Sequence, residues 1–160
     1  MLVQGVPLNG KLDKMEFDGT HVTIVDYKTG NPEKSKDKIK PPTAKEPNGG
    51  DYWRQSVFYK LLIDNYKLKD YKVVKTSFQF VEPNDKKEYI VQDVFASEDD
   101  LVTVRKQIKD TWLAIQNHNF YTGCGKETCH WCNFVKDNNQ YVSLQEALHN
   151  DVDEEALEEG

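Results

Sequence analysis

Two aspartates and a lysine near the N-terminus have the residue types of a site that holds a divalent cation beside an ammonium group. Asp26 and Lys28 lie two residues apart in VTIVDYKTG (residues 22–30), and Asp13 lies in the preceding segment LNGKLDKMEF (residues 8–17). The β-forming residues of 22–30 predict a strand, in which residues two apart point to the same face. We therefore expect Asp26 and Lys28 side by side at a strand end.

A hairpin turn would bring the second carboxylate close. Asp18-Gly19, between the two segments, is a preferred pair for a two-residue turn. A loop of these two residues places Asp13 opposite Ile24 and diagonal to Asp26 on one face, with backbones roughly 7–8 Å apart. Two carboxylates at that separation can share one divalent cation. A register shift of one residue would move Asp13 to the other face, and an ordinary exposed salt-bridge cluster is the alternative interpretation.

Composition sets broad limits on the protein. Its 160 residues suit one domain, or one domain with a tail. The net charge of −6 is unevenly spread, with acidic residues at 150–160 and lysines at 34–45, so it argues neither for nor against a nucleic-acid partner. The sequence has no apolar run of membrane-spanning length and no secretory pattern, so we expect a cytoplasmic protein without a membrane partner.

The remaining chain predicts alternating helices and strands. Residues 31–50 indicate a flexible, lysine-rich loop, for which a solvated linker is favoured over a phosphate-contacting loop. Helices are predicted over 51–66 and from about 97 to 118, the second opening with a capping box, and strands over 73–81 and 88–95. This order predicts an α/β or α+β domain with a central mixed β-sheet flanked by helices.

Side-chain spacing adds detail to two of these elements. In the first helix, an apolar face is formed by Trp53, Val57, Phe58, Leu61 and Leu62. Gln55 and Tyr59, four residues apart, share another side that could face the carboxylates, although a surface glutamine and a boundary tyrosine are the alternative. In the strand over 73–81, alternation predicts one shared face for Val74, Thr76, Phe78 and Phe80.

Three cysteines follow the second helix. Cys124, Cys129 and Cys132 have the spacing C-x4-C-x2-C, which favours metal ligation over a disulfide framework. They are one ligand short of the usual four for zinc or an iron–sulfur cluster, and His130, inside the C-x2-C loop, is a candidate fourth zinc ligand. Thiols of a surface turn, or a small zinc-binding interaction domain, are the alternatives. Residues 136–160 are expected to form an extension with a disordered acidic tail.

Three motifs in order resemble the PD-(D/E)XK nuclease superfamily, and most of all the RecB-like nuclease domain found at the C-terminus of UvrD-type helicase–nucleases. The motifs are VPLNGKLDK (residues 6–14), IVDYKTG (residues 24–30) and QSVFY (residues 55–59). The resemblance implies a restriction-endonuclease-like fold over residues 1–135. It also implies a metal-dependent deoxyribonuclease that works with a helicase domain, in the same or a partner chain, in double-strand break repair. A catalytically silent DNA-binding module with this fold is the alternative.

The resemblance also implies a site. The matching positions are Asp13 and Asp26 as metal-binding carboxylates, Tyr27 through its backbone carbonyl, Lys28 as the catalytic lysine, and Gln55 and Tyr59 as support for the site and contacts to the nucleic-acid backbone. Mg²⁺ or Mn²⁺ held there would lower the pKa of a bound water and bridge phosphate oxygens, while the lysine adds positive charge in the transition state.

Two features of this family are missing from the sequence. Cys124, Cys129 and Cys132 resemble the C-terminal cysteines of its iron–sulfur members, which implies a 4Fe–4S cluster in a full-length protein, but the fourth, upstream cysteine is not in this sequence. An upstream helix with a further metal-holding residue is also not evident. Both gaps lead us to expect a C-terminal fragment of a larger helicase–nuclease, and a fragment of this kind can lack activity.

Overall fold

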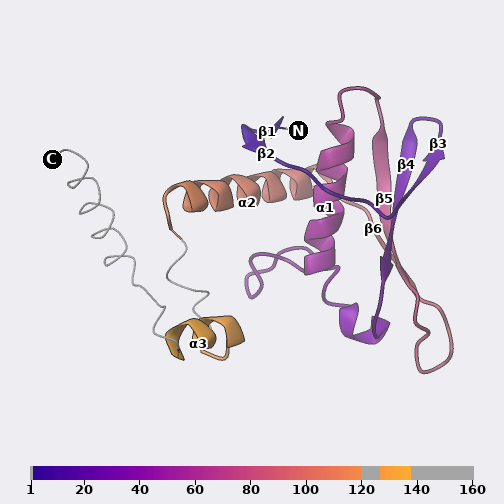
Figure 1. Ribbon diagram of the computed structural model, residues 1–160. Coiled ribbons are helices and arrows are strands. Elements are labelled where there is room, and N and C mark those ends of the chain that lie inside the picture. The colour runs from indigo at the N-terminus through magenta and orange to yellow at the C-terminus, as the bar shows by residue number, and fades with distance from the viewer. Residues whose placement is uncertain (1, 120–126, 138–160) are drawn as a thin grey trace. The chain divides into compact units, whose positions relative to one another are not determined.

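The computed structural model describes residues 2–119 and 127–137 (Figure 1). Contacts between Cα atoms divide the chain into two compact units, residues 1–109 and 110–160. The elements are β1 Leu2–Val3, β2 Val6–Pro7, β3 Lys14–Asp18, β4 His21–Lys28, the 3₁₀ helix η1 Pro32–Ser35, α1 Asp51–Asp64, β5 Lys72–Phe80, β6 Val91–Val94, α2 Glu98–Gln116 and α3 His130–Asp137.

The predicted mixed sheet is present in the first unit. Its order is β3-β4-β5-β6, with β4 and β5 parallel and the outer pairs antiparallel (Figure 1). A parallel pair needs a crossover connection, and α1 lies in the segment that joins β4 to β5. The fold is a mixed α/β arrangement of the restriction-endonuclease-like type, as predicted. Separately, β1 and β2 form a small two-stranded sheet.

The hairpin of β3 and β4 forms, but its turn lies one residue later than predicted. Asp18 pairs with His21, so the loop residues are Gly19 and Thr20. Gly19 has a φ of 59°, and a glycine with positive φ at the first loop position is the pattern of a type II′ turn. The pairing shifts by two residues as a result. Because the side-chain period of a strand is two, the residues of β3 keep their predicted faces, and Asp13 lies just before the first of them.

A β-bulge at Val74 changes which residues of β5 lie on the buried face, so the predicted face is wrong at the start of the strand. Val22 pairs with Val73 and Thr23 pairs with Lys75, which leaves Val74 between the two pairs. Val74 is consequently exposed, at 48 %, and not on the buried face with Thr76, Phe78 and Phe80 as predicted. Val73 takes its place and packs against Val22 and Ile24.

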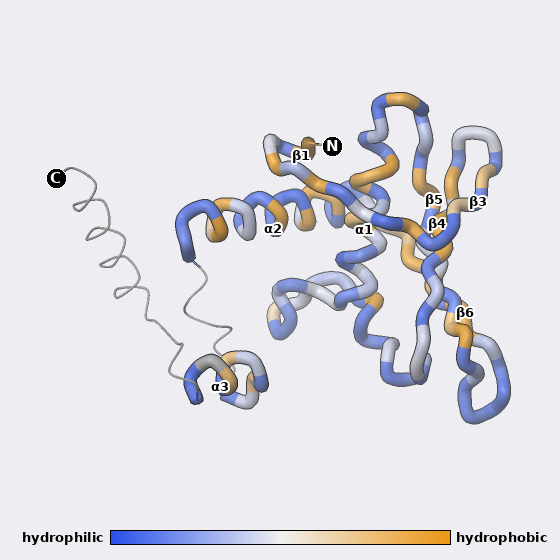
Figure 2. Tube along the Cα trace, in the orientation of Figure 1, coloured by the Kyte–Doolittle hydropathy of each residue, from blue (hydrophilic) through white to orange (hydrophobic). Residues whose placement is uncertain are grey.

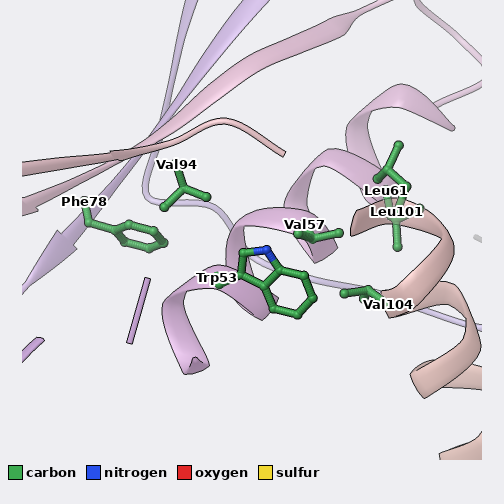
Figure 3. Packing of buried hydrophobic residues seen from close by; sticks show 7 residues of the cluster. All are labelled: Trp53, Val57, Leu61, Phe78, Val94, Leu101 and Val104. Atoms are coloured by element: carbon green, nitrogen blue, oxygen red, sulfur yellow. The ribbon is translucent and has the colours of Figure 1, made fainter. Parts of the chain in front are cut away.

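The core lies where α1 and α2 meet the sheet. The predicted apolar face of α1 is confirmed, and a buried cluster joins α1, α2 and the strands through Trp53, Val57, Leu61, Phe78, Val94, Leu101 and Val104 (Figure 3). The capping box of α2 is also confirmed, since the backbone N–H of Asp100 donates to Ser97 Oγ at 3.2 Å and Ser97 N–H donates to Asp100 Oδ2 at 2.8 Å. Packing against α1 fixes the sheet face that carries Asp26.

The lysine-rich segment 31–50 follows a defined path against the sheet and α1. It contains η1, in which Pro32 and Ser35 are buried, and Ser35 Oγ donates to Gln92 Oε1 of β6 at 3.1 Å. Most of the segment is hydrophilic, in contrast to β4 and β5 (Figure 2). Its mobility is still a prediction.

Two predicted features lie partly or wholly outside the described residues. Cys124 and the acidic tail belong to the undescribed parts of the chain, and the predicted domain boundary near residue 135 stays a prediction. The partner strand of β5 is shorter than the predicted 88–95, because pairing with β5 is confined to Val91–Val94. Among the described helices, none has the length and apolar character needed to span a membrane.

Candidate metal-binding and catalytic site

Asp26 is a buried carboxylate in the central strand of the sheet. It lies near the C-terminal end of β4 and is 4 % exposed. Its Oδ1 accepts hydrogen bonds from Tyr59 Oη at 2.7 Å and from Gln55 Nε2 at 3.0 Å, both on α1. Burying a charge without partners is strongly unfavourable, so these bonds, with the neighbouring lysine, are what permit the carboxylate to lie inside.

Lys28 completes a closed ring of polar contacts around Asp26. Its Nζ lies 2.8 Å from Asp26 Oδ2 and donates to Gln55 Oε1, also at 2.8 Å. The amide of Gln55 therefore bridges the ammonium and the carboxylate, and Nε2 makes a further bond of 2.6 Å to Tyr59 Oη. This geometry fixes the orientation of both charged groups before any ligand arrives.

Tyr59 acts in this ring as a neutral donor. Burial raises the pKa of its hydroxyl well above the ordinary value, and the hydrogen bond to Asp26 and the negative charges of Asp26 and Asp13 raise the pKa further, against the smaller lowering by Gln55. The hydroxyl therefore keeps its proton at neutral pH and donates it to Asp26 Oδ1.

Asp13 lies just before β3 and directs its carboxylate at the backbone of β4. Its Oδ2 accepts the N–H of Tyr27 at 3.0 Å, and its side chain is exposed. The paired register ends at Lys14, which pairs with Val25, and Asp13 lies one residue before it. The predicted pairing of Asp13 with Ile24 is wrong, because Ile24 pairs with Met15, and the contact with Tyr27 is what places the Asp13 carboxylate beside β4.

The backbone carbonyl of Tyr27 faces the same edge. In an extended strand the N–H and C=O of one residue point to the same side, and the N–H of Tyr27 points to Asp13. The β3–β4 pairing begins only at Lys14, so this part of β4 lies beyond the last paired residue of β3. The carbonyl of Tyr27 therefore points to the edge of β4 at which Asp13 lies.

The sequence did not predict that two aromatic rings, those of Tyr52 and Phe78, lie against the Lys28 ammonium. Lys28 Nζ lies 4.5 Å from the ring centroid of Tyr52 and 5.3 Å from that of Phe78, and these two rings stack at 5.0 Å. A second ammonium, that of Lys38, lies 5.1 Å from the Tyr52 centroid. The helical spacing of Tyr52, Gln55 and Tyr59, at i, i+3 and i+7, is the signal that would have placed Tyr52 on the site's side of α1.

The donor set fits a hard divalent cation in its chemistry. The residues offer two carboxylates and one carbonyl, and Mg²⁺ is commonly bound through one or two carboxylates while it keeps several waters. Asp26 Oδ2 is buried, and among the described residues its one polar partner is the Lys28 ammonium at 2.8 Å. In the part of the chain that is described, no group of three or more acidic, histidine or cysteine side chains gathers around one point. A cation site at these residues would therefore have two carboxylates, Asp13 and Asp26.

Two of the three cysteines are described, and they lie at α3. Cys129 precedes this helix and its carbonyl accepts the N–H of Asn133 at 3.0 Å, while Cys132 lies inside it. Both are partly buried. His130 is the first residue of α3, and its ring meets that of Trp131 edge-on at 5.5 Å. Cys124 lies outside the described residues, so the predicted three-cysteine cluster stays a prediction.

Comparison with known proteins assigns the chain to a family. A family model, that of the PD-(D/E)XK nuclease superfamily, matches residues 1–136. No curated protein and no solved structure matches the sequence significantly. Because the family match covers most of the sequence, including every residue of the polar ring, the chain belongs to the PD-(D/E)XK nuclease superfamily.

Proposed function

We propose that this chain is the nuclease domain of a metal-dependent deoxyribonuclease that hydrolyses phosphodiester bonds at Asp13, Asp26 and Lys28. The observation that carries the proposal is the buried Asp26, held by Tyr59 and Gln55 with Lys28 at 2.8 Å. A purely structural ion pair would not need a second carboxylate, Asp13, directed at the adjoining backbone. Membership in the superfamily supports a nuclease activity.

Each residue has a distinct part in this proposal. Asp13, Asp26 and the Tyr27 carbonyl are the oxygen ligands for Mg²⁺ or Mn²⁺, and a cation bound there supplies hydroxide at neutral pH and neutralises phosphate charge. Gln55 and Tyr59 hold the Asp26 carboxylate in one orientation. Lys28 places its ammonium beside the phosphate oxygens, where it stabilises the negative charge that develops in the transition state.

A cleavage assay with matched variants tests the proposal. Labelled single-stranded and double-stranded DNA are incubated with the chain and Mg²⁺ or Mn²⁺, with EDTA as the metal-free control. We expect cleavage that Asp26→Asn and Asp13→Asn abolish. The control variant Asp18→Asn changes an exposed aspartate of the same hairpin and should cleave normally. Tight DNA binding without cleavage by the unaltered chain would favour the silent DNA-binding module instead.

The helicase context is a further part of the proposal. The order and spacing of the three motifs resemble the RecB-like nucleases of helicase–nucleases, which supports a role beside a helicase motor in double-strand break repair. Addition of a purified UvrD-type helicase to the cleavage assay tests this part. Cleavage that becomes ATP-dependent and processive would support it, and cleavage that is indifferent to the helicase would count against it.

A metal cluster on the cysteines is the last part. The C-x4-C-x2-C spacing supports ligation, and the sequence offers three cysteines where a 4Fe–4S cluster needs four. A full-length parent that contributes a fourth cysteine should therefore purify anaerobically as a brown protein, while this chain should be colourless. A colourless parent with one equivalent of zinc would instead assign the cysteines to zinc.

A further inference from the structure

We propose that Lys38 is a second phosphate-binding residue of the site, and that Tyr52 is the positioning residue that fixes it beside Lys28. The inference rests on the proposed nuclease function. Its ligand is the DNA backbone, specifically a phosphate next to the one that is cleaved. Lys38 lies in the lysine-rich segment 31–50, outside the three motifs that carry the family resemblance.

The geometry places two ammonium groups on one aromatic ring. The Nζ atoms of Lys28 and Lys38 lie 4.5 Å and 5.1 Å from the Tyr52 centroid. Both distances are within the range of a cation–π interaction, so the negative face of the ring stabilises both charges. The two nitrogens can therefore be no farther apart than the sum of these distances. Two positive charges this close are suited to neighbouring phosphates of one strand.

The backbone around Lys38 is fixed by contacts with α1. The carbonyl of Lys38 accepts the N–H of Trp53 at 2.9 Å, and the carbonyl of Lys40 accepts the N–H of Gly50 at 2.9 Å. A Cβ atom on Gly50 would lie 2.1 Å from the Lys38 carbonyl oxygen, so only glycine allows this close approach. The backbone position of Lys38 is thus fixed by hydrogen bonds and close packing against the start of α1.

Charge pairing distinguishes Lys38 from Lys36 and Lys40. Lys36 pairs with Glu33 and Lys40 pairs with Asp37, each within one turn. Within the described part of the chain, no carboxylate forms an ion pair with Lys38, whose ammonium rests on the Tyr52 ring and whose side chain is exposed. Its charge is therefore available to an incoming anion.

Lys28 and Lys38 would bind different phosphates of one DNA strand. Lys28 is held by Asp26 and Gln55 inside the site, where the proposed function places the reacting phosphate. Lys38 lies outside this ring of contacts and can bind a flanking phosphate as a point charge. An ammonium that neutralises a phosphate releases condensed counterions, and this release makes the contact measurable through salt.

The test measures how DNA affinity depends on salt. Binding of a short labelled single strand is followed by fluorescence anisotropy with Ca²⁺ in place of Mg²⁺, over a series of salt concentrations. We expect Lys38→Gln to reduce the slope of log K against log salt by about 0.7, the value for one phosphate on a single strand. Lys38→Arg should restore the slope. Lys34→Gln, a charge-matched control in the same segment, should leave it unchanged.

A second pair of variants tests the role of the ring. Tyr52→Leu removes the π face that holds Lys38 and should lower the slope as Lys38→Gln does, while Tyr52→Phe keeps the ring and should retain the slope. Calorimetric Mn²⁺ binding should be the same in the Lys38 variants as in the unaltered chain, which separates this contact from the metal site. A slope that Lys38→Gln leaves unaltered, or that Lys34→Gln lowers equally, would overturn the inference while the proposed nuclease function stands. A chain that binds DNA with the expected slopes but never cleaves it would overturn the nuclease function alone.

Discussion

Lys28 Nζ lies 2.8 Å from the buried Oδ2 of Asp26. The catalytic lysine of the proposed mechanism therefore forms an ion pair with a proposed metal ligand. The contact has a direct consequence for metal binding. A cation that approaches Oδ2 must compete with the ammonium that is already paired to it. Two positive charges about 4 Å apart repel each other by several kcal/mol at an effective dielectric constant of about 20. We therefore expect Lys28 to oppose metal binding at Asp26, although the proposed mechanism needs this lysine.

The first prediction concerns the variant Lys28→Met, which keeps the length of the side chain and removes its charge. We expect Mn²⁺ to bind at least tenfold more tightly, because removing only about 1.4 kcal/mol of the repulsion corresponds to a factor of ten, while DNA cleavage is lost. Calorimetry and the cleavage assay measure the two effects. Lys14→Met, on the surface of β3, is the control and should change neither. Weaker Mn²⁺ binding by Lys28→Met would show that the lysine supports the metal and does not compete with it.

The second prediction ranks Gln55 below Asp26. Gln55→Ala removes the bridge between Lys28 and Asp26, but Tyr59 still donates to Asp26 Oδ1. We expect activity to fall by about 10–100-fold, the usual effect of losing a residue that orients a metal ligand. Asp26→Ala should abolish cleavage. Single-turnover rates measure both, and the reverse order would contradict the assigned roles.

The third prediction uses the raised pKa of Tyr59. The unfolded chain loses the tyrosine proton near pH 10, whereas the folded chain keeps it to higher pH. The stabilisation is therefore full below pH 10 and is lost as the pH rises through the folded pKa. We expect Tyr59→Phe to lower the free energy of unfolding by about 1 kcal/mol at pH 8, and the deficit should shrink above pH 10.

Urea unfolding at a series of pH values measures the difference. Tyr89→Phe, at a tyrosine that is 70 % exposed, is the control and should show no such pH dependence. A deficit for Tyr59→Phe that stays constant from pH 8 to the alkaline limit would mean that Tyr59 titrates at its ordinary pKa.

The fourth prediction concerns the opposite face of the sheet, where Asp93 of β6 pairs with Lys75 of β5 at 2.6 Å. Burial alone would raise the pKa of Asp93, but the hydrogen bonds from Lys75 and Ser77 and the charge of Lys75 outweigh it and hold the pKa below its usual value. This stabilisation is present above the unfolded pKa near 3.9 and is lost as the pH falls through the folded pKa.

We expect Asp93→Asn to lower the free energy of unfolding by about 0.5 kcal/mol at pH 7, because both side chains are partly exposed and water screens the pair. The difference should vanish in acid. Asp70→Asn serves as the control, since the pair of Asp70 with Lys72 is largely exposed. Thermal unfolding at pH 7 and in acid distinguishes the two variants, and equal losses at both pH values would contradict the account.

The sequence predicted the local elements of the site well. The strand with Asp26 and Lys28 and the helix with Gln55 and Tyr59 both follow from residue periodicity, which is a local property. Gln55 and Tyr59 were expected to face the carboxylates, and the structure brings both into hydrogen-bond contact with Asp26.

Register was harder to predict because it depends on backbone geometry that residue types determine only weakly. The sequence allows a two-residue loop at Asp18-Gly19 or at Gly19-Thr20. The pairing of Asp18 with His21 shows that the second loop forms. Nothing in KVVKTSFQF distinguishes a regular strand from one with a bulge at Val74, where the extra residue reverses the face of Val73.

Contacts between distant segments could not be read from the sequence at all. Lys38 and Lys28 meet at Tyr52 because the backbone of residues 38–40 packs against the start of α1. That packing depends on the absence of a side chain at Gly50. In the sequence, Lys38 is one of several similar lysines, and only the fold distinguishes it from Lys36 and Lys40.

The measurement that tests the central claim most directly is calorimetric titration of Mn²⁺ into the unaltered chain, Asp26→Asn, Asp13→Asn and the control Asp18→Asn. If Asp13 and Asp26 hold one cation, the unaltered chain and Asp18→Asn bind about one equivalent with the same affinity. Binding is then lost in Asp26→Asn and at least tenfold weaker in Asp13→Asn. Equal binding by all four proteins, or no binding by the unaltered chain, would contradict a metal site at these two carboxylates.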